Sequence, residues 1–204
     1  MKKIICICLL SFLCSCASGP IHVAKNQTES IKSNYEDAKL KMLYAENESL
    51  MNEIYNRFAA FNVNFYKEGI GFTALKGDKN ERLNYLMINI RPGEVFFNEG
   101  TSKPEQRFSD VLQMYFPKYL NHVKKSDIDR KGIDGLAMGI YWPVRDYSQC
   151  NQYGGFLEYI HVYFSREDVI DYLERRKLFK EVINDSEVIT SLELQPAKTV
   201  RPMF

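Results

Sequence analysis

The sequence lacks an excess of charge of either sign. Its 204 residues include 27 Lys and Arg and 26 Asp and Glu, which leaves a formal net charge of +1. Proteins that bind nucleic acid or an anionic membrane surface usually present a strongly basic face. The composition gives no electrostatic basis for either kind of partner, and no nucleic-acid partner is predicted.

The chain also lacks the short motifs of the common enzyme classes. It contains no G-x-G-x-x-G, P-loop, H-E-x-x-H, G-x-S-x-G or EF-hand sequence. Each of these motifs places the groups that bind phosphate, metal or an acyl intermediate. Their absence favours a non-enzymatic protein, and no cofactor is predicted.

Cysteine is scarce after residue 16. Four of the five cysteines are Cys6, Cys8, Cys14 and Cys16, and the fifth is Cys150. Zinc-binding cysteines usually occur as C-x₂₋₄-C pairs on turns, with a second pair far away in the sequence. The first four cysteines lie instead in or beside an apolar run, at spacings that do not fit this pattern. No metal site is predicted.

The apolar run at the N-terminus is too short to span a membrane. It extends from Ile4 to Leu13, about ten residues, whereas a spanning helix needs ~20. Lys2 and Lys3 precede it, and small residues such as Ser15 follow it. This is the three-part layout of a secretory signal. Residues 1–15 are therefore predicted to be a signal peptide.

The junction Leu13-Cys14-Ser15-Cys16 resembles the lipobox of bacterial lipoproteins. In that family a Leu stands three residues before an invariant Cys, and a small residue stands directly before it. The resemblance implies that residues 1–15 are removed and that Cys16 carries acyl chains such as palmitate. Membrane lipid would then be a partner of the chain through Cys16. Two or three acyl chains anchor a domain firmly, because each buried CH₂ contributes about 0.8 kcal/mol.

The resemblance also predicts where the protein is located. A lipoprotein is anchored in the cell envelope, and Ala17 after the acylated Cys implies the outer membrane, facing the periplasm, if the host is Gram-negative. With Cys16 acylated, Cys150 has no partner for an internal disulfide. The domain is therefore predicted to fold without a disulfide.

The rest of the chain is predicted to form one domain on a tether. Residues 16–29 are polar and aperiodic and are predicted to be a lipidated tether; residues 30–195 are predicted to form a single α+β domain; residues 196–204 are predicted to be a loose tail. The domain is expected to contain a largely antiparallel sheet of about five or six strands, a long N-terminal helix and two further helices. The N-terminal pattern also allows two helices in succession, because the apolar stripe shifts near Glu46 to Ser49. The further helices are expected to begin at Ser102, ending or bending early at Pro117, and at Ser165, continuing to about Ile183.

Period-two alternation defines the faces of the predicted strands. Leu86, Ile88 and Ile90 alternate with Tyr85, Met87 and Asn89; Leu136, Met138, Ile140 and Trp142 share one face of a later strand; His161 shares a face with Leu157, Tyr159 and Tyr163. Pro92-Gly93 suits the centre of a type II turn. We therefore expect a hairpin there, with a returning strand at 95–97.

The candidate binding segment is the loop from Trp142 to Gly155. It is longer than a hairpin needs, and long ordered loops are often functional. It holds the only Trp of the chain, together with Arg145, Tyr147 and Tyr153. Trp, Tyr and Arg dominate binding hot spots. These four residues are the predicted contact residues, although its strand phase points Trp142 inward with Ile140.

Three functions remain open at this point. The first is a non-enzymatic interaction or assembly module of the envelope with a protein partner. The second is a carrier of a small molecule, with an aromatic pocket between helix and sheet. The third is a thiol-dependent envelope enzyme, because His161 could act as a general base for Cys150. The alternative for His161 is a half-buried histidine paired with Tyr or backbone. The anchor, the tether and the missing catalytic motifs favour the first function.

Lipid attachment can be tested directly. Cys16→Ser removes the only sulfur that the lipobox resemblance assigns to acylation, so metabolic labelling with a radioactive fatty acid should give no labelled protein. Cys14→Ser, two residues away, is the matched control and should keep its label. Label that persists on the Cys16→Ser variant would refute the assignment.

Overall fold

A computed structural model describes residues 35–77, 81–93, 97–98, 100–145 and 156–192. The predicted signal peptide, tether and C-terminal tail lie outside the described residues, as do Cys16, Tyr147, Cys150 and Tyr153. The described part combines α-helices with a mostly antiparallel sheet, as expected. None of its helices is both long enough and apolar enough to cross a membrane.

Two successive helices occupy the region where one long N-terminal helix was expected. They are α2 (Ala38–Glu46) and α3 (Glu48–Ala59). Asp37 begins α2, since its side chain accepts hydrogen bonds from the backbone N–H groups of Lys39 and Leu40. Asn47, with φ −120°, separates the two helices, and its side chain donates to the carbonyl of Leu43. The single long helix is not supported, because the apolar stripe changes its phase at this asparagine.

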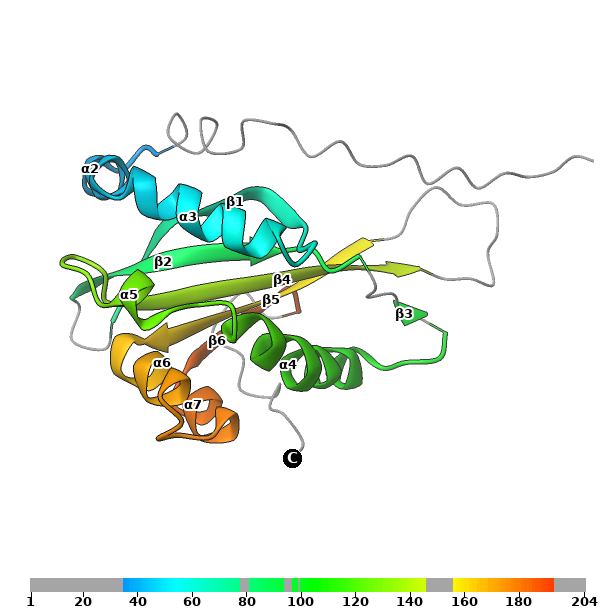
Figure 1. The fold of residues 1–204 in the computed structure, drawn as a ribbon. Coiled ribbons are helices and arrows are strands. Elements are labelled where there is room, and N and C mark those ends of the chain that lie inside the picture. The colour runs from blue at the N-terminus through cyan, green and yellow to red at the C-terminus, as the bar shows by residue number, and fades with distance from the viewer. Residues whose placement is uncertain (1–34, 78–80, 94–96, 99, 146–155, 193–204) are drawn as a thin grey trace, which may run out of the picture.

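In the described part of the chain, six strands form one sheet, which Figure 1 shows. The main path runs in the order β1-β2-β4-β5-β6, and β3 pairs with β4 off this path. The strands are β1 (Phe65–Lys76), β2 (Arg82–Ile90), β3 (Phe97–Asn98), β4 (Gly135–Arg145), β5 (Phe156–Ser165) and β6 (Glu187–Thr190). The β1–β2, β4–β5 and β5–β6 pairs are antiparallel, whereas β2 and β3 both lie parallel to β4.

The prediction of a hairpin at Pro92-Gly93 is wrong. The strand that follows these residues, β3, pairs with Val144 and Arg145 of β4 and not with β2. β2 itself pairs with β4 from Tyr85↔Gly135 to Ile90↔Ile140, in parallel. A parallel pair requires a long crossover connection. Helices α4 (Pro104–Leu120) and α5 (Lys125–Ile128) lie within that connection.

Helix α4 departs from its predicted ends. Its N-cap is Lys103, with no side-chain cap, while the hydroxyl of Ser102 donates to the carbonyl of Asn98. Pro117 neither ends nor shortens the helix, which continues to Leu120. A proline in the last turn removes only one intrahelical bond, and the packing of the helix's apolar face outweighs that loss.

The helix predicted from Ser165 to about Ile183 is two helices, α6 (Arg166–Leu173) and α7 (Phe179–Asn184). Ser165 caps α6 as expected, because its hydroxyl oxygen accepts from the N–H of Asp168. Arg175 then adopts φ 60°, and the next residue donates its N–H to the carbonyl of Asp171. A left-handed residue followed by such a bond ends a helix.

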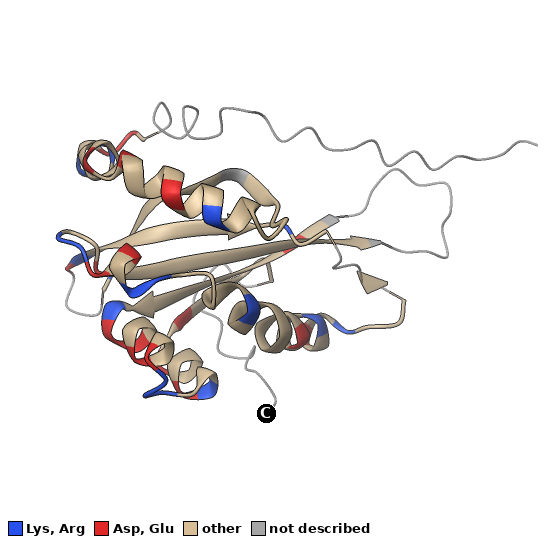
Figure 2. Ribbon diagram, in the orientation of Figure 1, with Lys and Arg blue, Asp and Glu red and all other residues tan. Residues whose placement is uncertain are grey.

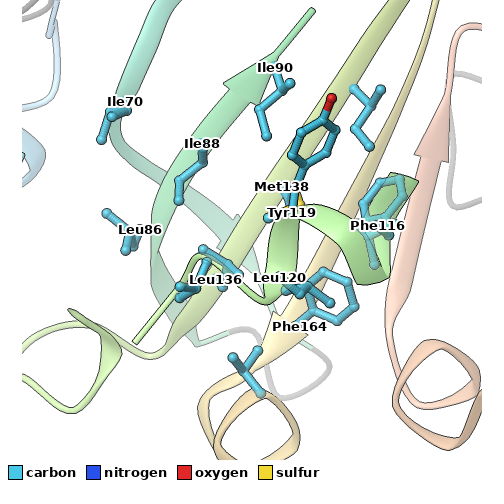
Figure 3. Packing of buried hydrophobic residues seen from close by; sticks show 14 of the residues in the cluster. Ile70, Leu86, Ile88, Ile90, Phe116, Tyr119, Leu120, Leu136, Met138 and Phe164 are labelled. Atoms are coloured by element: carbon cyan, nitrogen blue, oxygen red, sulfur yellow. The ribbon is translucent and has the colours of Figure 1, made fainter. Parts of the chain in front are cut away.

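The hydrophobic core lies on one face of the sheet. Figure 1 shows the helices on the viewer's side of the strands. The inward residues include Leu86, Ile88, Leu136, Met138, Ile140, Ile160 and Val162, all fully buried. Figure 3 shows Phe116, Tyr119 and Leu120 of α4 pointing at this face. The strand faces predicted for β2 and β4 are therefore confirmed.

A buried ion pair ties α4 to the sheet. Arg107 is 1% exposed and Glu158 of β5 is 2% exposed. The guanidinium binds both carboxylate oxygens, with Nε 2.9 Å from Oε2, and it also donates to the carbonyl of Ser102. Nε1 of Trp142 donates to the same Oε2 at 2.9 Å. Every charged atom of this pair thus has a partner, which such burial requires.

Replacing only one partner of this ion pair should lower the free energy of unfolding more than replacing both partners. Glu158→Leu leaves the buried guanidinium of Arg107 without a counter-charge and Nε1 of Trp142 without an acceptor. We therefore expect the free energy of unfolding to fall by about 3–5 kcal/mol. Adding Arg107→Met should restore most of that loss, because no buried charge then remains unpaired. Urea denaturation measures both values.

Lys125→Ala serves as the control for the ion-pair experiment. It removes an exposed bridge to Glu174 of 2.7 Å, and exposed bridges contribute roughly 0–1 kcal/mol. A double variant that is less stable than Glu158→Leu would contradict the account of the buried pair.

Candidate functional site

The second face of the sheet, here called the open face, carries no helix of the described part of the chain. Tyr85 and Ala137 lie on it, and they are the two buried hydrophobic residues of that part that fall outside the main core. Its side chains come from the strand positions that alternate with the core positions. They are Tyr85, Met87 and Asn89 of β2, Gly135, Ala137, Gly139 and Tyr141 of β4, and Leu157, Tyr159, His161 and Tyr163 of β5.

Strand β4 is the part of this face with the smallest side chains. Its open-face residues Gly135, Ala137 and Gly139 have almost no side chain. Asn89 pairs with Gly139 on one side, and His161 pairs with it on the other. A Cβ at position 139 would stand 2.4 Å from Oδ1 of Asn89 and 2.9 Å from Nε2 of His161. The glycine therefore lets the amide and the imidazole converge above the strand.

A groove of about 520 Å³ lies on the open face. Aromatic and aliphatic side chains from β1, β4, β5 and β6 line it: Tyr66, Tyr141, Leu157, Tyr159, His161, Tyr163 and Ile189. Neighbouring rings of this lining contact one another. Tyr66 stacks on Tyr141 with their centroids 4.0 Å apart, and Tyr159 meets His161 edge to face at 5.5 Å. Known ligand pockets have volumes of ~300–1,000 Å³.

His161 is paired and neutral in this groove. Its Nε2 lies 2.6 Å from the hydroxyl oxygen of Tyr141, which confirms the expectation of a half-buried histidine paired with tyrosine. Burial lowers the pKa of His161 to about 4. A general base works best when its pKa is near the working pH, so His161 is a weak base at neutral pH. Cys150, the thiol that His161 would have to activate, lies outside the described residues.

The groove carries no charge on its described lining. Burial raises the pKa of Tyr163, with a further contribution from Glu187 on β6, so that phenol stays neutral at neutral pH. Figure 2 shows the charged residues mainly on the helices and near the ends of strands, away from the middle of β4 and β5. The site thus offers aromatic faces and neutral hydrogen-bonding groups.

Asn89 has an unsatisfied acceptor beside His161. The residue is 5% exposed, and no donor in the described part of the chain reaches its buried Oδ1. A buried carbonyl without a partner costs roughly 1–3 kcal/mol. Nothing in the described part pairs with Nδ1 of His161 either, since the one recorded bond of the ring uses Nε2. Asn89 is not among the residues that line the groove, and Oδ1 of Asn84 on the same strand is likewise buried without a partner in the described part.

The residues predicted to make contacts occupy different environments. Trp142 is fully buried against Phe108, with centroids 5.0 Å apart, as its strand phase indicates. Arg145 is the last residue of β4, and Tyr147 and Tyr153 lie outside the described residues. The groove on the open face was not predicted, although the alternation in β5 had already placed Tyr159, His161 and Tyr163 together. What the sequence could not indicate is that Tyr66 and Tyr141 join them.

A second groove, of about 650 Å³, lies between α5 and the α6–α7 pair. Several cations line it, but Lys125 is bound to Glu174 at 2.7 Å, and Lys177 is bound to Asp168 at 2.6 Å. Acids thus already neutralise part of its positive charge. Within the described ranges no cluster of His, Cys, Asp and Glu could hold a metal ion.

No protein-family model, curated protein or solved structure matches this chain. The functional argument therefore depends on the geometry of the site.

The pKa of His161 predicts how stability depends on pH. The unfolded chain, with a pKa near 6.5, binds a proton more readily than the folded chain, with a pKa of about 4. The term from His161 is therefore complete above pH 6.5 and is lost as the pH falls toward 4. Between pH 7 and pH 5 we expect wild type to lose about 2 kcal/mol more than His161→Gln.

Urea denaturation at both pH values provides this comparison, and Gln keeps an acceptor for the Tyr141 hydroxyl. An equal pH dependence in the two proteins would show that the imidazole is not buried in its neutral form.

Proposed function

We propose that the protein is a lipid-anchored, non-enzymatic binding module of the cell envelope, and that the open face of its sheet is the binding surface. The observation that carries this proposal is the groove, since it is lined by aromatic residues and no helix of the described part covers it. The lipobox resemblance at Cys16 supports the anchor and the envelope location. For a Gram-negative host the proposed location is the outer membrane, facing the periplasm.

The groove bears on the choice between the two non-enzymatic functions. Its volume of about 520 Å³ falls in the range of small-ligand sites. A stable protein–protein interface instead buries about 800 Å² on each partner. A groove of this size accommodates a small ligand, one segment of a polymer or a side chain of a protein partner. The loop residues Arg145, Tyr147 and Tyr153 remain the proposed contact surface should the target be a protein.

Capture from envelope extracts tests this proposal. The full-length lipidated protein, tagged and held in detergent micelles, is used as bait, and retained proteins and glycans are both measured. Tyr159→Ala should reduce capture of the target at least about tenfold, because it removes an aromatic contact from the groove. Met114→Ser is the matched control, since Met114 is 63% exposed on α4, on the helix side.

The other variants decide between the remaining functions. Thermal melting shows whether Tyr159→Ala folds, and Leu157→Lys, which adds a charge to the rim of the groove, serves as a second variant. Unchanged capture by both would contradict the proposal. A loss only with Arg145, Tyr147 and Tyr153 all changed to Ala would move the surface to the loop. If Cys150→Ser alone abolished function, the protein would be a thiol enzyme.

A further inference from the structure

From the geometry of the open face we infer that Tyr66 and Tyr141 form a site of oxidative cross-linking. A small one-electron oxidant joins their two rings as dityrosine, and His161 accepts the phenolic proton of Tyr141. The inference concerns a covalent modification of the sheet itself, so it does not depend on any ligand of the proposed binding surface. Three features carry it: the contact between the two rings, the hydrogen bond to the imidazole, and the position of the pair in the sheet.

The two tyrosine rings are stacked in contact. Their centroids are 4.0 Å apart, and their planes are inclined by 26°. Tyr85 and Tyr163, by comparison, meet edge to face at 5.3 Å. Holding two reacting groups together turns an encounter between molecules into an intramolecular step, which favours the reaction strongly. Two phenoxyl radicals generated on the stacked rings therefore couple with each other before either meets another molecule.

The hydroxyl of Tyr141 has a base within hydrogen-bond distance. Its oxygen lies 2.6 Å from Nε2 of His161. Burial lowers the pKa of His161 to about 4, so the imidazole is neutral at neutral pH and Nε2 can accept a proton. A tyrosine that loses an electron becomes a far stronger acid than imidazolium, so its proton moves along this bond as the electron leaves. Tyr141 is thereby easier to oxidise than a tyrosine without such a base.

The reaction balances with two equivalents of oxidant. An inorganic radical, such as the carbonate or azide radical, removes one electron from each phenol and leaves as its anion. The proton of Tyr141 passes to Nε2 of His161, and the proton of Tyr66 passes to water. The two phenoxyl radicals then form one C–C bond between ring carbons beside their hydroxyls, and the hydrogens on these carbons move to the oxygens by tautomerisation. The product has lost two hydrogen atoms in all.

The position of the pair gives the cross-link a structural consequence. Tyr66 lies on β1 and Tyr141 lies on β4, and β2 separates these strands in the sheet order. Both side chains are half-buried in the lining of the groove, which admits a small radical but shields the rings from tyrosines of other molecules. A bond between them closes a long loop of the chain. By restricting the unfolded state, as a disulfide does, it should raise the melting temperature.

Radiolysis of the full-length protein in detergent micelles tests the inference. An azide solution saturated with nitrous oxide generates azide radicals, which oxidise tyrosine. The monomeric fraction is then isolated, so that links between molecules are removed, and digested with trypsin. The tryptic peptides 58–67 and 132–145 each contain one tyrosine, Tyr66 and Tyr141 respectively. A linked pair of these peptides, two hydrogen atoms lighter than the separate peptides together, identifies the cross-link by mass spectrometry.

Three variants assign the roles of the residues. Tyr66→Phe should abolish the linked peptides. Tyr159→Phe is the matched control, since Tyr159 lies 5.6 Å from Tyr141 on the same face, and it should keep them. His161→Gln should lower their yield at least about tenfold, because a positioned general base typically contributes more than this factor. Thermal melting before irradiation shows that each variant is folded.

The melting temperature after irradiation provides a second readout. Irradiated wild type should melt at a higher temperature than the untreated protein, whereas irradiated Tyr66→Phe should not. If the linked peptides are missing from irradiated wild type, or if dityrosine forms mainly between other peptides, the inference fails. An equal yield from His161→Gln would overturn the role of the imidazole as proton acceptor. None of these results bears on capture by the open face, which Tyr159→Ala tests separately.

Discussion

The alternation of large and small residues along β4 is the constraint on which the rest of the structure depends. Leu136, Met138, Ile140 and Trp142 fill the space between the sheet and the helices, and Gly135, Ala137 and Gly139 occupy the positions between them. The first set requires a helical layer, because large apolar side chains must be covered. The second set leaves room above β4, so side chains of β2 and β5 fold over it. One strand thus produces both the core and the groove.

The buried ion pair fixes the same strands from the helix side. Arg107 reaches from α4 to Glu158 on β5, and Trp142 on β4 donates to the same carboxylate. Glu158 and Trp142 are cross-strand partners, so one carboxylate joins a helix and the two strands that carry most of the groove. Tyr141 and Tyr159 flank this pair in sequence and point to the other face. The network therefore holds rigid the backbone from which the aromatic lining projects, which a preformed binding surface needs.

Local patterns were enough to predict the faces of the strands, but not their partners. Period two correctly separated Leu86, Ile88 and Ile90 from Tyr85, Met87 and Asn89, because each strand has one buried face. The same reasoning failed at Pro92-Gly93, since a turn dipeptide cannot show whether the following strand returns to β2 or pairs elsewhere. The break near Asn47 follows a change in phase of the apolar stripe, whereas the left-handed conformation of Arg175 and the continuation through Pro117 could not be predicted from periodicity. The groove could not be predicted for the same reason: Tyr66 and Tyr141 meet only after the sheet has assembled.

Strand β2 differs from the ion-pair network in how its polar groups are paired. Asn84 and Asn89 are 3% and 5% exposed, and neither buried Oδ1 has a donor among the described residues. In the ion-pair network, by contrast, Glu158 accepts from both Arg107 and Trp142. A buried acceptor without a partner costs roughly 1–3 kcal/mol. The two amides therefore lower the stability of the sheet on both of its faces, whereas the network around Glu158 has no such cost, and this makes the network the stronger link between the helices and the sheet.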